Sequence, residues 1–283
     1  MNRPHPLNAD EAATLQAQYR VQATVSPIDG YDALSASRLV RASALLESDG
    51  CDAFLDDLAI RLGTDSRPIA ASMLAKRYAA VVAVPFFHAL TCFDKELDLP
   101  LGSVLLRSGE EPGGHWLEGM TVDGLLRARA VTCAESRESW RLRAAENFVR
   151  FHLTLLWQSL SRSSGLPAMI LWENTAVRLF SLYEKKLPKL NAVPAAKIED
   201  DLRFLLHTLP AEAFGQRQQP FARFYSGSDV FQAFQEQKPG ISRTRLTCCL
   251  YYRVPREGGY CEACPKAVRQ SRSKAVDPER KQN

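Results

Sequence analysis

The sequence lacks an apolar run long enough to cross a membrane. The longest uncharged apolar stretch extends from Tyr78 to Phe93 and is interrupted by Pro85 and His88, whereas a membrane-spanning helix needs about 20 consecutive apolar residues. The first residues, Met-Asn-Arg-Pro-His-Pro, lead directly into polar sequence and do not resemble a secretory signal peptide. We therefore interpret residues 78–93 as a buried core helix with a kink at Pro85, and we expect a cytoplasmic protein.

A nucleotide-binding fingerprint is also missing. Helix-like and strand-like segments do not alternate along the chain, and no Gly-x-Gly-x-x-Gly motif follows a strand-like stretch. The pattern therefore argues against a Rossmann-type domain. If electrons for a redox reaction came from a nicotinamide, another protein would have to deliver them.

The main body of the chain has no excess of charge. The net charge of the 283 residues is +4, and residues 265–283 hold six basic and two acidic residues. Six minus two is four, so residues 1–264 are neutral overall, which gives no support for nucleic-acid binding. We predict that residues 266–283 form a flexible basic tail. Such a tail could contact an acidic partner protein or anionic lipid at the inner face of the membrane.

Helix-like patterns dominate what is present. The periodicity of apolar residues predicts helices over residues 8–22, 35–47, 51–62, 68–91, 138–161, 168–187 and 197–209. Strand-like stretches at 97–107 and 115–120 predict a small antiparallel hairpin. The sequence thus indicates an α+β protein that is mainly helical, with a small antiparallel β-hairpin or sheet and a cysteine-rich C-terminal loop.

Several side chains in these helices carry specific expectations. In the helix over 138–161 we expect one apolar face formed by Trp140, Phe148, Phe151, Leu155 and Leu156. The remaining expectations concern residues that we interpret as structural. The acidic pairs are expected to be solvated and not catalytic: Asp56-Asp57, Glu110-Glu111 and Asp200-Asp201. The isolated cysteines are expected to be small buried apolar residues: Cys51, Cys92 and Cys133.

The most informative stretch is the cysteine segment, residues 248–264. It holds four of the seven cysteines, here called the cysteine quartet: Cys248, Cys249, Cys261 and Cys264. In a reducing compartment, clustered cysteines more often bind metal than form disulfides. A [2Fe–2S] cluster needs four ligands, usually cysteine thiolates, and a Cys-x-x-Cys pair can direct both sulfurs to one site. We therefore interpret the quartet as the ligands of a [2Fe–2S] cluster.

The vicinal pair constrains the backbone. Adjacent side chains in a strand point to opposite faces, so Cys248 and Cys249 can serve one centre only if the chain bends. Any regular strand should therefore end near Leu246 or Thr247. Eleven residues separate the two cysteine pairs, and the Pro255–Gly259 loop among them lets the chain fold back.

Four arginines flank the cysteine pairs. An oxidised four-thiolate [2Fe–2S] cluster carries roughly −2 charge, which arginines could offset, with a higher reduction potential as the result. The candidates for this tuning are Arg243, Arg245, Arg253 and Arg256. The alternative is that all four are solvated.

Two other uses of the thiols stay open at this point. Structural zinc takes the same ligands, usually as two separated Cys-x-x-Cys knuckles, and the vicinal pair departs from that spacing. A thiol–disulfide redox site could use Cys261 and Cys264, but it would leave the vicinal pair without a role and lacks the βαβ context of such sites.

The cysteine segment resembles a known signature. The sequence Arg-Leu-Thr-Cys248-Cys249-Leu-Tyr-Tyr-Arg with Gly-Gly-Tyr-Cys261-Glu-Ala-Cys264-Pro is similar to the C-terminal [2Fe–2S] motif of the FhuF family of ferric siderophore reductases. The eleven-residue spacer is one residue longer than is usual in that family, and we expect the extra residue in the loop before Gly259. Weaker similarity extends to Leu74-Ala-Lys-Arg-Tyr78 and to Leu171-Trp-Glu-Asn174.

The resemblance implies a function. It implies one-electron reduction of a ferric siderophore, of the hydroxamate type, and release of Fe(II) in the cytoplasm, because hard oxygen donors bind Fe(II) far less tightly than Fe(III). It also implies an electron donor, either a flavin-dependent reductase or a ferredoxin-like protein. The chain would then consist of a mainly helical siderophore-binding domain (1–240), a cluster segment (241–265) and the basic tail (266–283).

Substrate contacts and rival functions complete the sequence-based hypotheses. Side chains that could contact the siderophore are Lys76, Arg77, Trp172, Asn174 and Tyr252. The alternatives are core packing for Trp172 and Tyr252 and solvated helix faces for the others. The rival functions are a [2Fe–2S] protein that senses iron or redox state and an interaction protein stabilised by structural zinc.

Overall fold

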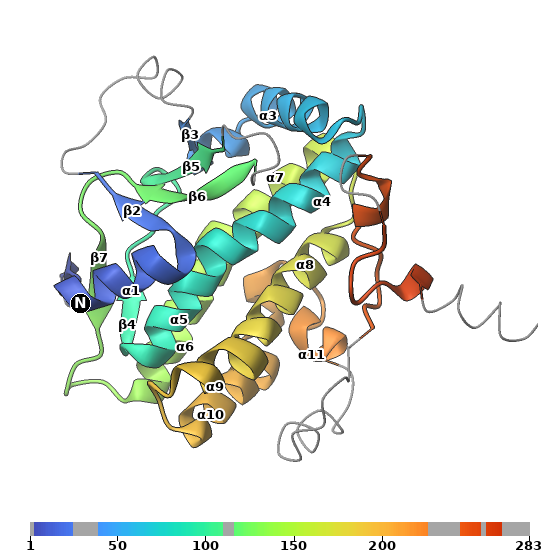
Figure 1. Cartoon of the computed structure of the whole chain (residues 1–283). Coiled ribbons are helices and arrows are strands. Elements are labelled where there is room, and N and C mark those ends of the chain that lie inside the picture. The colour runs from blue at the N-terminus through green and yellow to red at the C-terminus, as the bar shows by residue number, and fades with distance from the viewer. Residues whose placement is uncertain (1–2, 25–38, 110–115, 226–243, 256–258, 268–283) are drawn as a thin grey trace, which may run out of the picture.

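A computed structural model describes residues 3–24, 39–109, 116–225, 244–255 and 259–267. Long helices form the centre of the molecule, two small sheets lie against one side of them, and the cysteine segment lies at the opposite end (Figure 1). The predicted α+β class is confirmed.

The first helix, α1 (Ala9–Tyr19), begins at a capping box. The Glu11 amide donates a hydrogen bond of 2.8 Å to Asn8 Oδ1, and the Asn8 amide donates one of 3.1 Å to Glu11 Oε2. The helix ends before residue 22, the expected limit, because Arg20 adopts a left-handed conformation with φ of 58°. The chain then continues as strand β2 (Val21–Ala23).

In the part of the chain that the structure describes, seven short strands form two sheets. The four-stranded sheet has the order β2-β6-β5-β3, with β3 (Leu39–Arg41), β5 (Val104–Ser108) and β6 (Leu117–Val122). The three-stranded sheet has the order β1-β7-β4, with β1 (His5–Pro6), β4 (Lys95–Leu97) and β7 (Arg127–Ala130). The predicted hairpin is confirmed as the antiparallel pair β5–β6, and β2 adds to it in parallel.

The prediction of a helix over residues 35–47 is wrong for residues 39–47, the part of this range that the structure describes. After strand β3 comes a 3₁₀ turn, η1 (Ala42–Leu46), and helix α3 (Ser48–Leu62) starts directly behind it. Gly50 therefore lies in the first turn of α3 and does not end a helix. A Cβ atom at Gly50 would lie 2.4 Å from the Ala44 carbonyl oxygen, so the close contact of η1 with α3 requires glycine there.

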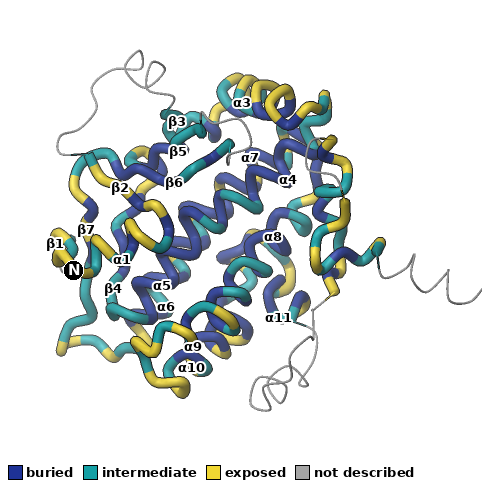
Figure 2. The backbone as a smooth tube through the Cα atoms, viewed as in Figure 1, coloured by how far each residue is buried: buried dark blue, intermediate teal, exposed yellow. Residues whose placement is uncertain are grey.

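The apolar stretch found in the sequence forms the central helix. Its consecutive parts are α4 (Arg67–Tyr78), the π-helical turn η2 (Ala79–Ala83) and α5 (Val84–Cys92). Among the described residues, this run is the one helix long and apolar enough for a membrane span, yet its most apolar window is 83% buried by the rest of the protein. Figure 2 shows it as a buried rod through the middle of the molecule. The expected core helix is confirmed, and its π turn immediately precedes Pro85, which cannot donate the usual backbone hydrogen bond.

A second long helix packs beside the central one. Its consecutive parts are α6 (Arg137–Phe148), the π-helical turn η3 (Val149–Thr154) and α7 (Leu155–Ser164). Trp140, Phe148 and Leu156 are buried as predicted, but Phe151 is 60% and Leu155 40% exposed. The π turn explains this error, because its extra residue shifts all later side chains around the helix axis by roughly 100°.

The remaining helices complete the core and bring the chain to the cysteine segment. They are α8 (Ala168–Ser181), η4 (Leu182–Lys186), α9 (Leu187–Leu190), α10 (Ala195–His207), η5 (Ala211–Phe214), α11 (Pro220–Phe224) and η6 (Tyr251–Arg253). Helix α8 packs along α4, and its Trp172 makes edge-to-face contacts with Trp157, Phe214 and Phe221. These rings belong to α7, η5 and α11, and they fix α8 within the core.

One acidic residue expected in solvent is a buried anchor. The Asp201 side chain is fully buried, and its two oxygens accept hydrogen bonds of 2.9 and 2.8 Å from Arg137, while Arg141 contacts it as well. We expect Asp201→Asn to lower the free energy of unfolding by about 3 kcal/mol, because two arginines would lose their buried partner. Urea denaturation measures this loss.

Asp200 provides the matched control for that measurement. Its side chain is 62% exposed although it also pairs with Arg141, so Asp200→Asn should cost less than about 1 kcal/mol. Equal losses for the two variants would contradict a structural role for Asp201.

Candidate metal centre

The cysteine segment forms two limbs that lie against each other and against the ends of α4 and α8 (Figure 1). The first limb carries the vicinal pair and the second carries the Cys-x-x-Cys pair. The Arg245 amide donates a hydrogen bond of 3.0 Å to the Ala263 carbonyl oxygen, which joins the limbs. The Cys264 amide donates one of 2.9 Å to the Cys261 carbonyl oxygen, which closes a tight turn between these two cysteines.

This arrangement brings the four thiols together. The Sγ atoms of Cys249 and Cys261 are 3.5 Å apart. Cys248 lies within electrostatic range of Cys249 and Cys264, and Cys261 lies within range of Cys264. Cys249 and Cys264 are buried, while Cys248 and Cys261 are partly exposed. The quartet therefore sits at the edge of the protein, with two thiols inside and two facing outward.

The backbone bends at the vicinal pair as the sequence required. No strand is present in residues 244–255, and Leu250 adopts a left-handed conformation with φ of 62° directly after Cys249. The short turn η6 follows, and Val254 is buried in the core beyond it. The expectation that no regular strand continues through the pair is met.

A single buried carboxylate holds the first limb. Glu173 on α8 accepts hydrogen bonds from the Leu246 amide (2.6 Å) and the Thr247 amide (2.8 Å), and also from the Thr247 hydroxyl. Its Oε2 atom lies 3.5 Å from Arg245 Nη2. Glu173 and Arg245 are both buried, so each depends on the other for charge compensation.

A second set of hydrogen bonds, from α4 and α8, fixes the backbone of the vicinal pair. The Ser72 hydroxyl on α4 donates to the Cys249 carbonyl oxygen at 2.7 Å. Asn174 on α8 donates through Nδ2 to the Ser72 carbonyl oxygen at 2.9 Å and accepts through Oδ1 from Arg245 at 2.7 Å. The two central helices thus set the position of the backbone that carries Cys248 and Cys249.

Positive charge surrounds the thiols. The hydrogen bond from Cys261, together with the nearby cations Arg245 and Lys76, lowers the pKa of Cys249 to about 5, although burial of the thiol opposes this shift. The same bond raises the pKa of Cys261. Burial lowers the pKa of Arg178, which also lies within electrostatic range of Cys249 and Cys261. Three partly or fully buried cations therefore offset the negative charge that four thiolates would bring.

The four arginines predicted to raise the reduction potential of the cluster fall into three groups by position. Arg245 lies beside the thiols, as proposed from the sequence, but it is also the buried partner of Glu173. Arg253 is exposed. Arg243 and Arg256 lie outside the described residues.

The side chains predicted to contact the siderophore also differ in where they lie. Trp172 is packed in the aromatic core and Asn174 belongs to the second set of hydrogen bonds, and neither side chain reaches the surface, so we do not retain them as substrate contacts. Lys76 lies with Nζ 4.2 Å from the Tyr251 ring, next to the quartet. Tyr252 stacks on Tyr260 with 5.6 Å between ring centroids and remains partly exposed.

Three residues that shape the centre escaped the sequence analysis: Ser72, Glu173 and Arg178. Glu173 had a signal, because it is the one charged residue of the Leu171-Trp-Glu-Asn174 stretch and follows five apolar residues of its helix. Ser72 and Arg178 had none, since their neighbours in space are far away in sequence. Among the isolated cysteines, the expectation of burial is met by Cys51 but is wrong for Cys133, which is exposed.

The donor set of four cysteine thiols fits a [2Fe–2S] cluster. A [2Fe–2S] cluster takes four cysteine thiolates, two on each iron. Two cysteine pairs on two limbs, joined at Cys249 and Cys261, match that requirement.

Two protein families match the chain, one over its helical body and one over the cysteine segment. The family described as "Ferric iron reductase FhuF-like transporter" matches residues 72–227, more than half of the chain. The family described as "FhuF 2Fe-2S C-terminal domain" matches residues 245–266. No curated protein matches the chain. Glu173 belongs to the first matched region and Arg245 to the second, so the buried ion pair joins the two.

Proposed function

Because the chain belongs to the family of FhuF-like ferric iron reductases, we propose that it reduces the Fe(III) of a hydroxamate siderophore by one electron and releases Fe(II) in the cytoplasm. The observation that carries this proposal is the cysteine quartet, held in two pairs at the edge of the protein beside partly or fully buried cations. The second family match identifies the cofactor as the [2Fe–2S] cluster predicted from the sequence.

The quartet is proposed to hold this cofactor: Cys248, Cys249, Cys261 and Cys264. When bound, the cluster supplies single electrons at a potential set by its surroundings. The chain holds the backbone of the first limb, which carries Cys249, through Ser72 and Glu173, and it leaves Cys248 and Cys261 partly exposed. Hydroxamate oxygens bind Fe(II) far less tightly than Fe(III), so one electron is enough to free the metal.

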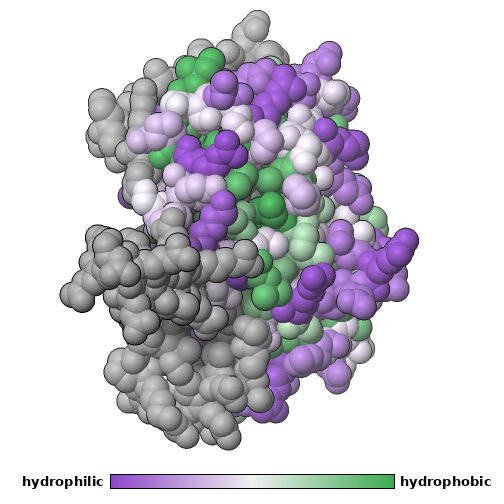
Figure 3. All heavy atoms as spheres, turned by 90° about the vertical axis from the view of Figure 1, so that its right-hand side faces the viewer, coloured by the Kyte–Doolittle hydropathy of each residue, from purple (hydrophilic) through white to green (hydrophobic). Residues whose placement is uncertain are grey.

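The electron donor is proposed to be a flavin-dependent reductase or a ferredoxin-like protein. Figure 3 looks at the face that carries the cysteine segment and shows apolar surface in its middle with polar side chains around it. Leu246 is 53% and Tyr260 40% exposed beside the quartet. Exposed apolar side chains with a polar surround are typical of transient protein contacts.

The division of the chain and its location belong to the same proposal. We assign siderophore binding to residues 1–240, electron transfer to residues 241–265 and, where it is needed, contact with the inner face of the membrane to the basic tail 266–283. The tail lies almost entirely outside the described residues.

Anaerobic reoxidation tests the proposed reaction. Protein reduced with dithionite and freed of excess reductant should regain its visible absorption when a ferric trihydroxamate complex is added. A ferrous chelator should then trap close to one Fe(II) per cluster, because a [2Fe–2S] cluster gives up one electron. The Ga(III) complex of the same siderophore is the control, since Ga(III) is not reduced.

A cluster that stays reduced, with no Fe(II) trapped, would rule out the reductase function. That result would favour the rival in which the cluster senses iron or redox state.

A further inference from the structure

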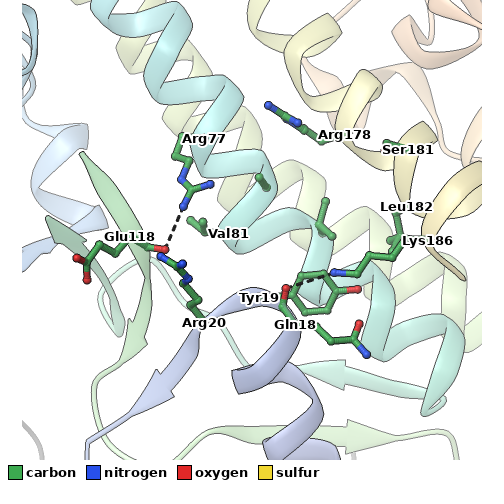
Figure 4. A pocket seen from close by; sticks show the side chains of 12 residues that line it. Gln18, Tyr19, Arg20, Arg77, Val81, Glu118, Arg178, Ser181, Leu182 and Lys186 are labelled. Carbon is green, nitrogen blue, oxygen red and sulfur yellow. Dashed lines mark hydrogen bonds between the residues drawn. The ribbon is translucent and has the colours of Figure 1, made fainter. Parts of the chain in front are cut away.

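A groove of about 310 Å³ lies between the end of α1, the junction of α4 with η2, and the end of α8. Its walls come from four parts of the chain that are far apart in sequence, the fourth being Glu118 of β6 (Figure 4). Positively charged side chains dominate this lining: Arg20, Arg77, Arg178 and Lys186. Glu118 is its only carboxylate among the described residues, and it accepts a hydrogen bond of 3.3 Å from Arg107, which lies outside the lining.

The groove cations have no carboxylate partners within the described residues. Arg77 donates to the backbone carbonyl oxygens of Leu117 (2.6 Å) and Glu118 (3.1 Å), which orient the guanidinium without neutralising it. Lys186 lies over the Tyr19 ring with Nζ 3.7 Å from the centroid. The Arg178 Nε atom is buried and makes no hydrogen bond.

This concentration of charge is unfavourable without a counter-ion. Burial, together with repulsion from Arg178 and Arg20, lowers the pKa of Arg77 to about 10. Burial and repulsion from Arg245 lower the pKa of Arg178. Structural arginines in this fold have carboxylate partners, as Arg137 has in Asp201. Cations gathered in a hollow without such partners are typical of a site that binds an anion.

Arg178 links the groove to the cysteine quartet. Arg178 extends from α8 toward α4 (Figure 4) and lies within electrostatic range of both Cys249 and Cys261. It follows Asn174 by one helical turn, or roughly 6 Å along α8. Arg77 adjoins Lys76, which faces the quartet. A ligand seated in the groove would therefore lie beside the site of electron transfer.

Resting on the proposed function, we infer that this groove is the substrate site and that it selects ferric complexes with a net negative charge. Three hydroxamates neutralise Fe(III) completely, so a ferric trihydroxamate offers these cations no charge. A siderophore that combines hydroxamates with a central hydroxycarboxylate and further carboxylates forms an anionic ferric complex. Arginine forks suit such carboxylates, and an open groove of this size can hold one side of the complex.

Binding of redox-inert complexes tests this inference separately from reduction. The probes are the Ga(III) complexes of a citrate-based dihydroxamate siderophore, which is anionic, and of a neutral trihydroxamate siderophore. Calorimetry on the cluster-loaded protein should give tighter binding of the anionic complex, with an affinity that falls as salt is added. The double variant Arg20→Gln/Lys186→Gln should bind the anionic complex about tenfold more weakly and the neutral one unchanged.

A matched variant and the reduction assay make the outcomes distinct. Lys185→Gln/Lys189→Gln removes two exposed lysines of the same region that do not line the groove, and it should bind both complexes as the wild type does. Equal affinity of the wild type for the two Ga(III) complexes would overturn the charge preference, as would an unchanged affinity in the Arg20/Lys186 variant. Weaker binding of the donor protein alone in that variant would also overturn it, since the groove would then be a protein contact.

The proposed function can survive such a failure. If the neutral ferric trihydroxamate still reoxidises the reduced cluster, the protein is a reductase whose substrate does not use the groove cations. Conversely, binding of the anionic Ga(III) complex without any reduction of its Fe(III) counterpart would overturn the proposed function and leave the anion site in place.

Discussion

Serine in place of any one of the four quartet cysteines is expected to abolish the visible absorption of the [2Fe–2S] cluster. A serine hydroxyl keeps its proton where a cysteine thiol becomes a thiolate, so one iron would lose a strong ligand. Absorption spectra and iron-to-protein ratios of freshly purified variants measure the loss. We expect less than about one tenth of the wild-type iron content, because all four ligands are required.

The four positions should differ in their effect on folding. Cys249 and Cys264 are buried at 2% and 3% exposure, so serine there also buries a hydroxyl and should lower the stability of the apoprotein by about 1–3 kcal/mol. Cys248 and Cys261 are partly exposed and should lose the cluster with little change in apoprotein stability.

The control for these variants is Cys133→Ser. Cys133 is exposed and far from the segment in sequence, so the spectrum should be retained in full. A fully coloured Cys248→Ser protein would show that the vicinal pair supplies only one ligand.

Removal of the Glu173 carboxylate is expected to have the second-largest effect. In Glu173→Gln, an NH2 group replaces one of the two oxygens that accept hydrogen bonds from the backbone amides of Leu246 and Thr247. The buried Arg245 also loses its only carboxylate partner among the described residues. The cost should be about 3–5 kcal/mol for docking of the first limb. Cluster loading should fall, and release of iron to a chelator should accelerate at least tenfold.

The damage should be local. Helix α8 is held by Trp172 and its aromatic neighbours, so far-UV circular dichroism should stay close to the wild type. Glu138→Gln, which changes an exposed glutamate in the first turn of α6, should alter neither loading nor iron release.

A double variant separates charge from packing. In Glu173→Gln/Arg245→Met no unpaired charge is left in the interior, so its loss of stability should be smaller than the sum of the two single losses. Additive losses would show that the pair does not act as a unit, and wild-type iron retention in Glu173→Gln would show that the limb is held elsewhere.

Local signals in the sequence predicted the local parts of the fold well. The start of the first helix next to residue 8, the end of helix α3 at Leu62 and the apolar run after Pro68 depend on contacts between near neighbours. The predictions failed where π turns occur, because the added residue in η3 rotates Phe151 and Leu155 out of the core. No residue type marks a π turn, since it arises from the packing of the whole helix.

The same contrast between local signals and long-range packing applies to the site. The ligand set, the bend at the vicinal pair and the [2Fe–2S] cofactor were predicted from residue types and short spacings. The surroundings of the thiols were not. Asp200 and Asp201 look alike in the sequence, but only the second is enclosed by arginines. Likewise, of the stretch Trp172-Glu173-Asn174, the residue that reaches the cysteine segment amides is the one that carried no prediction.

The sequence by itself thus determined what this protein can bind, because metal ligation depends on thiols at short fixed spacings. Only the tertiary structure decided how the centre is held and what lies beside it. Ser72 meets Cys249 across 177 residues and Glu173 meets Thr247 across 74, and the groove gathers its cations from the end of α1, α4, α8 and η4. Contacts of this kind depend on how α4 and α8 pack, and packing is a property of the assembled core, not of any stretch within it.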